Sequence, residues 1–187
     1  MSGSRPARQG QAVSVETFIA RWSGSGAAER ANYQLFLSEL CDVLDVPRPN
    51  PTVRNESDNT YVFEKRVTFT HPDGTTTEGR IDLYKKGHFI LEAKQGVTNE
   101  PTQPAARGRR GHGVRGTEGW DDAMYAARGQ ADQYARALPP DEGWPPFLIV
   151  VDVGHSIELH AEFSRSGRTY VQYPDPYSYR FNLQNLL

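Results

Sequence analysis

The stretch from Gly79 to Gly96, GRIDLYKKGHFILEAKQG, constrains the fold more than any other part of the chain. Two segments rich in apolar and β-branched residues flank the sequence KKGH, a pattern typical of two antiparallel strands joined by a tight turn. The first strand carries Asp82, and the second ends with Glu92 and Lys94. A hairpin folded at this turn brings Asp82 near the Glu92 end of the partner strand. The sequence therefore predicts a hairpin on which two carboxylates and a lysine converge.

Alternation along the second strand decides which side chains can meet. Glu92 and Lys94 share one face with Ile90, whereas the opposite face is apolar. The face taken by Asp82 depends on the register of the two strands, which the sequence leaves open. An ordinary cross-strand salt bridge on a solvated hairpin would use the same residues.

Two carboxylates that are held close together repel each other unless a positive charge lies between them. A hard divalent cation such as Mg²⁺ or Mn²⁺ prefers oxygen ligands of this kind and keeps several waters. Such a cation lowers the pKa of a bound water and neutralises charge that develops on a phosphate. A lysine beside it can orient the nucleophile or stabilise the transition state. Asp82, Glu92 and Lys94 are thus candidate residues of a site for phosphodiester hydrolysis.

The order of predicted elements around the hairpin indicates one α+β domain. Amphipathic helices are expected after Ser14, a good N-cap, and over residues 28–44. The later expected elements are strands at 60–70, 76–84 and 89–95, a helix at 120–138, and strands at 147–154, 156–163 and 168–174. A β-meander followed by a crossover helix and a buried strand predicts a mixed central sheet with flanking helices. Residues 1–12 are expected to be disordered, 13–187 to form a single domain, and 97–119 to be a mobile basic loop within it.

Composition excludes several classes of protein. The net charge of −2 and the pI near 6.2 argue against a chain that coats nucleic acid by bulk electrostatics, although local basic contacts remain compatible with them. The sequence has no apolar run long enough for a membrane span and no secretory signal at its start. The single Cys41 cannot form an internal disulfide, so we expect a cytoplasmic protein. No zinc-ligand cluster, P-loop or serine-hydrolase elbow is found.

The segments GRIDLY and FILEAKQG resemble the core of the PD-(D/E)xK nuclease superfamily, with Asp82 in the first acidic position and Glu92-Ala93-Lys94 as the ExK triplet. Ile81 stands in place of the proline of the name-giving dipeptide. The resemblance implies a restriction-endonuclease-like core of order αβββαβ. It also implies that Asp82, Glu92 and the Ala93 carbonyl hold Mg²⁺ or Mn²⁺, while Lys94 positions the water that cleaves DNA and leaves a 5′-phosphate.

The same superfamily often carries a glutamine or tyrosine on the helix after the ExK strand. By this resemblance Gln130 and Gln133 are further candidate catalytic residues. An acidic residue on the first helix of the core is a common third metal ligand, and Glu39 is the candidate here. A solvated helix carboxylate is an equally good interpretation of Glu39.

Basic residues suggest where a nucleic acid would lie. The glycine-rich segment RGRRGHGVRG and the hairpin turn contain candidate phosphate contacts, namely Arg107, Arg109, Arg110, Arg115, Lys85 and Lys86. A solvated linker and soluble turn lysines would show the same pattern. Double-stranded DNA is the expected partner, and the sequence leaves a homodimer open.

A second resemblance covers nearly the whole chain. FIARW, AERANYQLFLSELCDVLDVPRP and the hairpin are similar to the N-terminal region of MmeI-like fused restriction–modification polypeptides. In these a nuclease domain precedes a helical connector and an adenine methyltransferase. The resemblance implies a nuclease module whose partner is that C-terminal region, since no methyltransferase signature occurs here. The alternative is a catalytically inactive module with the nuclease fold that binds DNA or serves as a scaffold.

Overall fold

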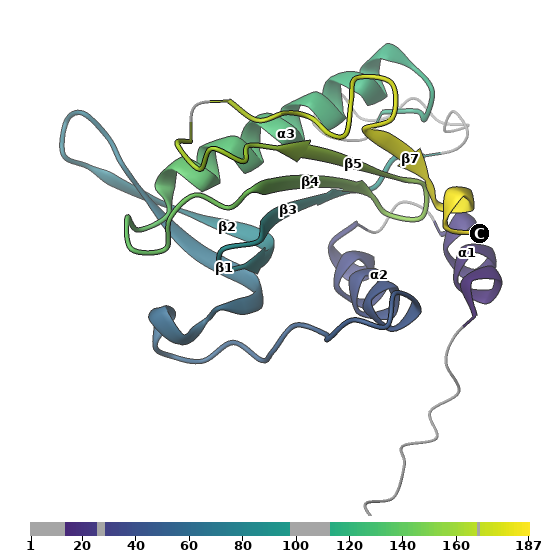
Figure 1. Cartoon of the computed structure of the whole chain (residues 1–187), viewed down its shortest axis with the longest axis horizontal. Helices are drawn as coiled ribbons and strands as arrows, with labels where there is room; N and C mark the ends of the chain where they lie inside the picture. Colours follow the sequence, from purple (N-terminus) through teal and green to yellow (C-terminus); the bar gives the residue numbers. More distant parts are fainter. Residues whose placement is uncertain (1–13, 26–28, 98–112, 168) are drawn as a thin grey trace, which may run out of the picture.

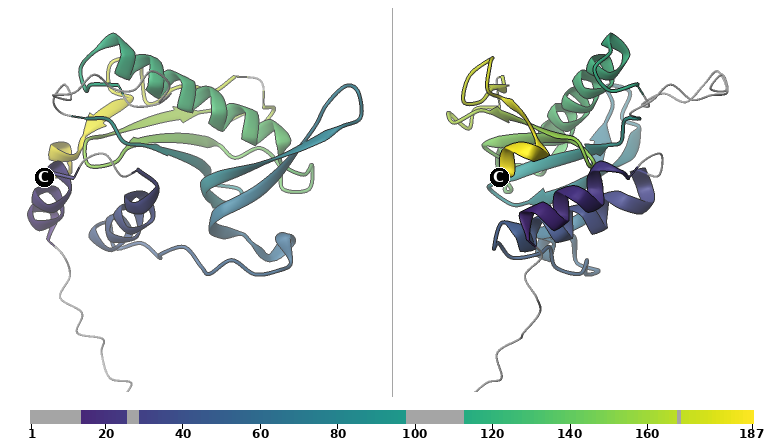
Figure 2. Two further views of the ribbon diagram at one scale, coloured as in Figure 1. Left: turned by 180° about the vertical axis from the view of Figure 1, so that it is seen from behind. Right: turned by 90° about the vertical axis from the view of Figure 1, so that its right-hand side faces the viewer.

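A computed structural model describes residues 14–25, 29–97, 113–167 and 169–187. A central sheet is covered on one face by α3 (Glu118–Ala137) and on the other by α1 (Val15–Ser23) and α2 (Glu29–Val43), as Figures 1 and 2 show. The strands are β1 (Tyr61–Thr70), β2 (Thr76–Lys85), β3 (Phe89–Lys94), β4 (Phe147–Asp152), β5 (Ser156–Ala161), β6 (Val171–Gln172) and β7 (Arg180–Asn182). Two short 3₁₀ helices, η1 (Glu56–Asp58) and η2 (Leu183–Leu186), complete the described part.

The sheet is mixed and mostly antiparallel. Its seven described strands follow the order β1-β2-β3-β4-β5-β6, with β7 paired to β5. β1, β2 and β3 form the predicted meander, and α3 carries the chain across to β4, which pairs parallel to β3. The predicted αβββαβ order and the α+β class with a restriction-endonuclease-like layout are confirmed. The edge strand expected at 168–174 shortens to β6, and β7 was not predicted.

Local sequence explains where the main elements begin and turn. The Ser14 side chain caps α1 by accepting a hydrogen bond from the Thr17 N–H at 3.2 Å. Gly87 has φ of 71°, a left-handed value that favours glycine, and it closes the turn between β2 and β3. α3 buries its apolar stripe against the sheet, as its spacing predicts; the buried positions are Trp120, Met124, Ala127, Ala131, Tyr134 and Ala135.

The core has two sides, separated by the sheet. Phe18, Trp22 and Phe36 of α1 and α2 pack with Leu91 and Ala93 on one side. On the other side α3 covers a second set of apolar side chains; from the sheet these include Val67, Ile81, Tyr84, Ile90, Leu148 and Val150. The alternation predicted for the second strand of the hairpin is therefore confirmed, because Ile90 faces α3 whereas Leu91 and Ala93 face α1 and α2.

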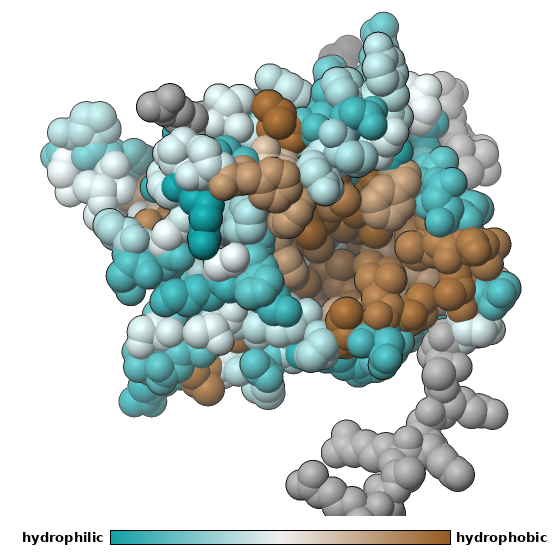
Figure 3. Space-filling model, viewed as in Figure 1, coloured by the Kyte–Doolittle hydropathy of each residue, from teal (hydrophilic) through white to brown (hydrophobic). Residues whose placement is uncertain are grey.

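An apolar groove lies between α2 and the sheet and appears as the brown hollow in Figure 3. Its volume is about 300 Å³, and α2 contributes Leu37, Leu40 and Cys41 to its wall. Strands β1 to β5 and β7 supply its floor, and Lys85 is the one charged residue among the described residues that line it. α1 and α2 thus cover this face of the sheet less completely than α3 covers the other. No helix in the described part is long and apolar enough to cross a membrane.

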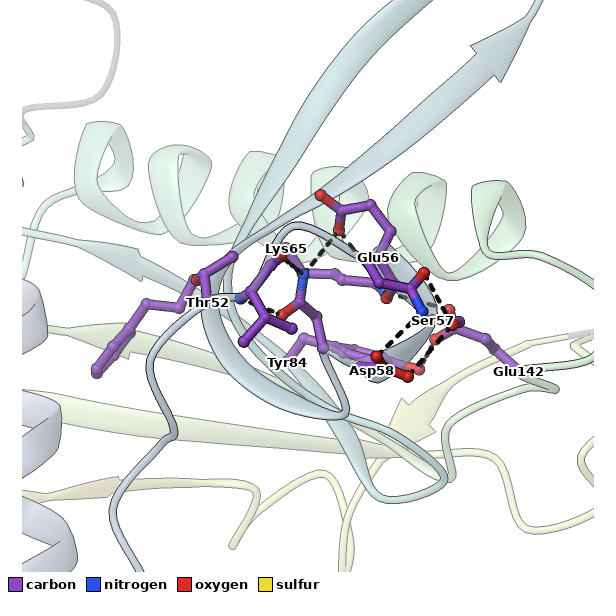
Figure 4. A network of polar contacts seen from close by, with 11 residues as sticks. Thr52, Glu56, Ser57, Asp58, Lys65, Tyr84 and Glu142 are labelled. Atoms are coloured by element: carbon purple, nitrogen blue, oxygen red, sulfur yellow. Dashed lines mark hydrogen bonds and ion pairs between the residues drawn. The ribbon is translucent and has the colours of Figure 1, made fainter.

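A buried ion pair ties β1 to the loop that precedes β4 (Figure 4). Lys65 is 3% exposed, and its ammonium lies 3.2 Å from Glu142 Oε1 and donates to the Glu56 carbonyl at 2.7 Å. The Tyr84 hydroxyl donates to the other Glu142 oxygen. Because the charges are paired and hydrogen-bonded, this lysine–carboxylate pair is a structural link.

Part of the predicted basic loop is described. Val114 forms an isolated bridge with Val97, and the segment ends in α3, which begins two residues before the predicted start. Residues 98–112, like the predicted disordered segment 1–12, lie outside the described residues.

Candidate active site

A fork between β2 and β3 creates the site. Pairing of these strands ends at Leu83–Leu91, and one residue further along Asp82 turns its side chain into the gap. Asp82 Oδ2 accepts a hydrogen bond from the Ala93 N–H at 2.7 Å. The N–H and C=O of a strand residue point toward the same neighbouring strand, so the Ala93 carbonyl also faces the fork. Its oxygen accepts a hydrogen bond from Lys94 Nζ at 3.0 Å.

Glu92 is buried beside this fork with little compensation for its charge. It is 1% exposed, and its Oε1 atom has no hydrogen-bond partner among the described residues. The other oxygen lies 3.6 Å from Lys94 Nζ, an ion pair that is too long for a hydrogen bond. Burial, together with the negative charge of Asp82, raises the pKa of Glu92 to about 8, although Lys94 opposes the shift. The site therefore has too little positive charge for both carboxylates to be ionised.

The donor set fits a hard divalent cation. Two carboxylates and the Ala93 carbonyl are all oxygen ligands, and the orphan Glu92 oxygen is the kind of atom that a cation would satisfy. Within the described ranges no cluster of three or more His, Cys, Asp or Glu side chains could hold a metal. A magnesium site does not need three side chains, because this ion keeps several of its waters.

Lys94 is the third predicted residue that the structure brings to the site. Its side chain is 19% exposed and is therefore more accessible to solvent than that of Glu92. It bridges the Glu92 carboxylate and the Ala93 carbonyl. The structure thus places Asp82, Glu92 and Lys94 together, as the hairpin pattern predicts.

The structure connects Glu39 to α1. Its Oε2 accepts a hydrogen bond from Trp22 Nε1 at 2.8 Å, and its Oε1 pairs with Arg21 at 2.8 Å. Both oxygens are therefore engaged in joining α1 to α2. This packing role accounts for the burial of Glu39, and among the described residues it forms no metal-binding cluster with Asp82 and Glu92.

The two glutamines lie on α3. Gln130 is half-buried and donates to the Tyr134 hydroxyl at 2.9 Å, whereas Gln133 is exposed. Tyr134 packs against the hairpin, where a Cβ on Gly79 would lie 2.6 Å from its ring. Gln130 is thus oriented toward β1 and β2, but its catalytic role, like that of Gln133, stays a prediction.

Arg115 is buried in an ion pair with Asp152. Its side chain is 7% exposed and donates to both Asp152 oxygens, at 2.8 and 3.0 Å. Asp152 also accepts hydrogen bonds from Gly96 N and Trp120 Nε1, each at 2.9 Å. The pair therefore anchors the segment after Lys94 to α3 and β4. The fully buried Asp152 requires a cation, and Arg115 supplies it. The predicted contact of Arg115 with a phosphate stays a prediction.

The remaining basic candidates are less constrained. Arg107, Arg109 and Arg110 lie outside the described residues. Lys85 places its ammonium 4.8 Å from the Tyr61 ring, and Lys86 is half-buried in the turn. DNA contacts at these positions stay a prediction.

Two side chains near the site carry no sequence pattern that would reveal them. Tyr33 of α2 is 4% exposed, and its hydroxyl donates to Glu64 of β1. Burial raises the pKa of the Tyr33 hydroxyl, and the negative charges of Glu64 and Asp82 raise it further. In the sequence Glu64 is simply one acidic residue of an alternating strand, and Tyr33 is one aromatic residue of an amphipathic helix.

Comparison with known proteins gives one result. No curated protein and no solved structure matches this chain. A family model described as "MmeI, N-terminal domain" matches residues 10–186, which is nearly the whole chain. The chain therefore belongs to the MmeI N-terminal domain family.

Proposed function

We propose that the protein is a Mg²⁺-dependent endonuclease module that hydrolyses phosphodiester bonds in double-stranded DNA. The observation that carries the proposal is the buried Glu92, with an orphan oxygen and a pKa near 8, beside Asp82 at a strand fork. Burying such a carboxylate costs stability and is expected where a cation binds. The family match supports the context, because MmeI-type domains indicate a module of a restriction–modification enzyme.

The roles of the residues follow from their contacts. Asp82, Glu92 and the Ala93 carbonyl would hold the cation, and the Ala93 N–H fixes the orientation of the Asp82 carboxylate. When bound, the cation would lower the pKa of a water and offset charge on the phosphate. Lys94, whose ammonium contacts the Ala93 carbonyl and the Glu92 carboxylate, would orient the attacking water or a phosphate oxygen.

The contrast with Lys65 supports a functional rather than a structural pair. Lys65 and Glu142 lie 3.2 Å apart, and additional hydrogen bonds satisfy both groups. Lys94 and Glu92 lie 3.6 Å apart, and one oxygen of Glu92 is left without a partner among the described residues. A pair that served stability alone would be expected to resemble the first.

Cleavage of supercoiled plasmid and linear duplex DNA in Mg²⁺ or Mn²⁺ tests the proposal. Lys94→Ala and Glu92→Gln should abolish cleavage, whereas Glu78→Gln, an exposed carboxylate on the same strand as Asp82, should cut like the wild type. Cleavage that persists unchanged in Lys94→Ala would show that the assignment of the site is wrong.

Calorimetric titration with Mn²⁺ separates the nuclease from a catalytically inactive DNA-binding or scaffolding module. The nuclease requires one class of binding site that is lost in Asp82→Asn and Glu92→Gln. Binding of DNA without such cation binding would instead identify the inactive module. The proposal further expects a C-terminal methyltransferase region as the partner in the restriction–modification enzyme, and expression with that region should be compared if the domain alone does not cut.

A further inference from the structure

An unusual backbone conformation occurs opposite Asp82. Glu64 on β1 has φ of 55°, in the left-handed region that non-glycine residues seldom adopt inside a strand. The pairs of β1 and β2 on either side of this point are Phe63–Leu83 and Lys65–Ile81. The register is therefore continuous, but Glu64 and Asp82, which face each other, form no pair. Both strands are distorted at the same place.

The distortion turns β2 over. Ile81 and Leu83 are two residues apart, and a regular strand would place both on one face. Instead Leu83 packs with the α1 and α2 side of the core, whereas Ile81 packs with the α3 side. The reversal is centred on Asp82 and lets its carboxylate lie in the fork, where it accepts the Ala93 N–H. If Asp82 were part of a regular β-ladder, its side chain would project from one face of the sheet. The Ala93 N–H would then donate to a backbone carbonyl of β2 instead of to the Asp82 carboxylate.

Contacts from α2 and β2 hold Glu64 in its conformation. The Tyr33 hydroxyl donates to one Glu64 oxygen, and Arg80 lies 3.7 Å from the other. Gln34 Nε2 donates to the Tyr33 hydroxyl at 2.9 Å and so fixes the direction in which the hydroxyl points. Because Tyr33 is buried and Arg80 is largely exposed, Tyr33 is the firmer of the two contacts.

We propose that Glu64, held by Tyr33, is a positioning residue that keeps β1 distorted and thereby aims Asp82 at the fork. The inference rests on the proposed function, because the Asp82 carboxylate matters there as a cation ligand. Tyr33 fixes the Glu64 side chain, and the backbone conformation of Glu64 in turn positions Asp82. Glu64 does not itself bind the cation. Outer residues that orient a metal ligand typically change metal affinity about 10- to 100-fold when they are removed.

Three variants test this role by Mn²⁺ titration. Tyr33→Phe keeps the buried ring and removes the hydroxyl, so the dissociation constant of Mn²⁺ should rise about tenfold. Glu64→Gln keeps an oxygen that can accept the Tyr33 hydrogen bond, and it should stay within about threefold of the wild type. Tyr61→Phe is the matched control, because it also removes a hydroxyl beside α2, one that contacts Cys41 at 3.5 Å.

A second measurement needs no metal. The Ala93 amide proton, hydrogen-bonded to Asp82 Oδ2, should exchange faster and shift upfield in the NMR spectrum of metal-free Tyr33→Phe, but not in that of Tyr61→Phe. Equal behaviour of the two tyrosine variants, with Mn²⁺ binding that still depends on Asp82, overturns the positioning role alone. A loss in Glu64→Gln as large as in Asp82→Asn also overturns it, because Glu64 would then be a ligand. A wild-type protein that binds no Mn²⁺ overturns both the role and the proposed function.

Discussion

Replacing Glu92 with glutamine should stabilise the metal-free protein at alkaline pH while it removes the proposed binding of a cation. Glu92 is 1% exposed, and burial followed by the charge of Asp82 raises its pKa to about 8 from 4.5. A carboxyl whose pKa is raised by folding stabilises the native state in its neutral form. That stability is fully present below the unfolded pKa and is lost as the pH rises through the folded pKa. The wild type without metal should therefore weaken steadily toward pH 8.

The size of the effect follows from linkage. Each unit of pKa difference corresponds to about 1.4 kcal/mol, so the wild type should lose roughly 3 kcal/mol of unfolding free energy between about pH 6 and about pH 9. Glutamine has a similar shape and does not titrate, so Glu92→Gln avoids this loss. At low pH the two proteins should differ less in melting temperature than at high pH. For a domain of this length, the melting temperature of Glu92→Gln minus that of the wild type should grow by roughly 6–12 °C from about pH 6 to about pH 9.

Thermal unfolding followed by circular dichroism in EDTA and in excess Mg²⁺ measures the effect at both pH values. Glu78→Gln serves as the control, because that side chain is exposed on the same strand as Asp82. Mg²⁺ should raise the melting temperature of the wild type and of the control, but not that of Glu92→Gln. The melting temperatures of Glu92→Gln and of the wild type could instead differ by the same amount at both pH values. That result would refute the reasoning, because it would show that folding does not raise the pKa of Glu92.

The same pKa predicts that Mn²⁺ binding releases a proton, so calorimetric affinity should rise about tenfold per pH unit below pH 8 and level off above it; a flat profile would contradict this. Lys65→Met leaves Glu142 buried without its cation and should cost roughly 3 kcal/mol in urea unfolding with Mn²⁺ affinity unchanged. Arg115→Ala leaves Asp152 unpaired, and the loss of roughly 3–5 kcal/mol should shrink when Asp152→Asn is added; additive losses would argue against the pairing.

The order of the elements could be predicted from the sequence because each signal is local. Alternation marks β1 to β3, a 3.6-residue apolar period marks α3, and a continuous apolar run marks β4, whose burial needs cover on both faces. Short β7 lacks such a signal, since it exists through its pairing with β5. Secondary structure that depends on a distant partner is not encoded in a short window of residues.

The site was predictable only in part, for a similar reason. Strand parity places Glu92 and Lys94 on one face, but the position of Asp82 depends on the reversal of β2, which periodicity cannot anticipate. Glu64 and Tyr33 become visible only when α2 is packed on the sheet. Arg115 stands in a glycine-rich basic stretch that reads as a solvated loop, and its buried partner Asp152 lies 37 residues away.

In the proposed nuclease, Asp82, Glu92 and the Ala93 carbonyl hold a divalent cation at the fork between β2 and β3. Anomalous diffraction from crystals soaked in Mn²⁺ tests it most directly. We expect one strong peak about 2.1–2.3 Å from an oxygen of each of these three residues, absent from crystals of Asp82→Asn. A fork without an anomalous peak at saturating Mn²⁺, with the Glu92 oxygen still unpartnered, would contradict it.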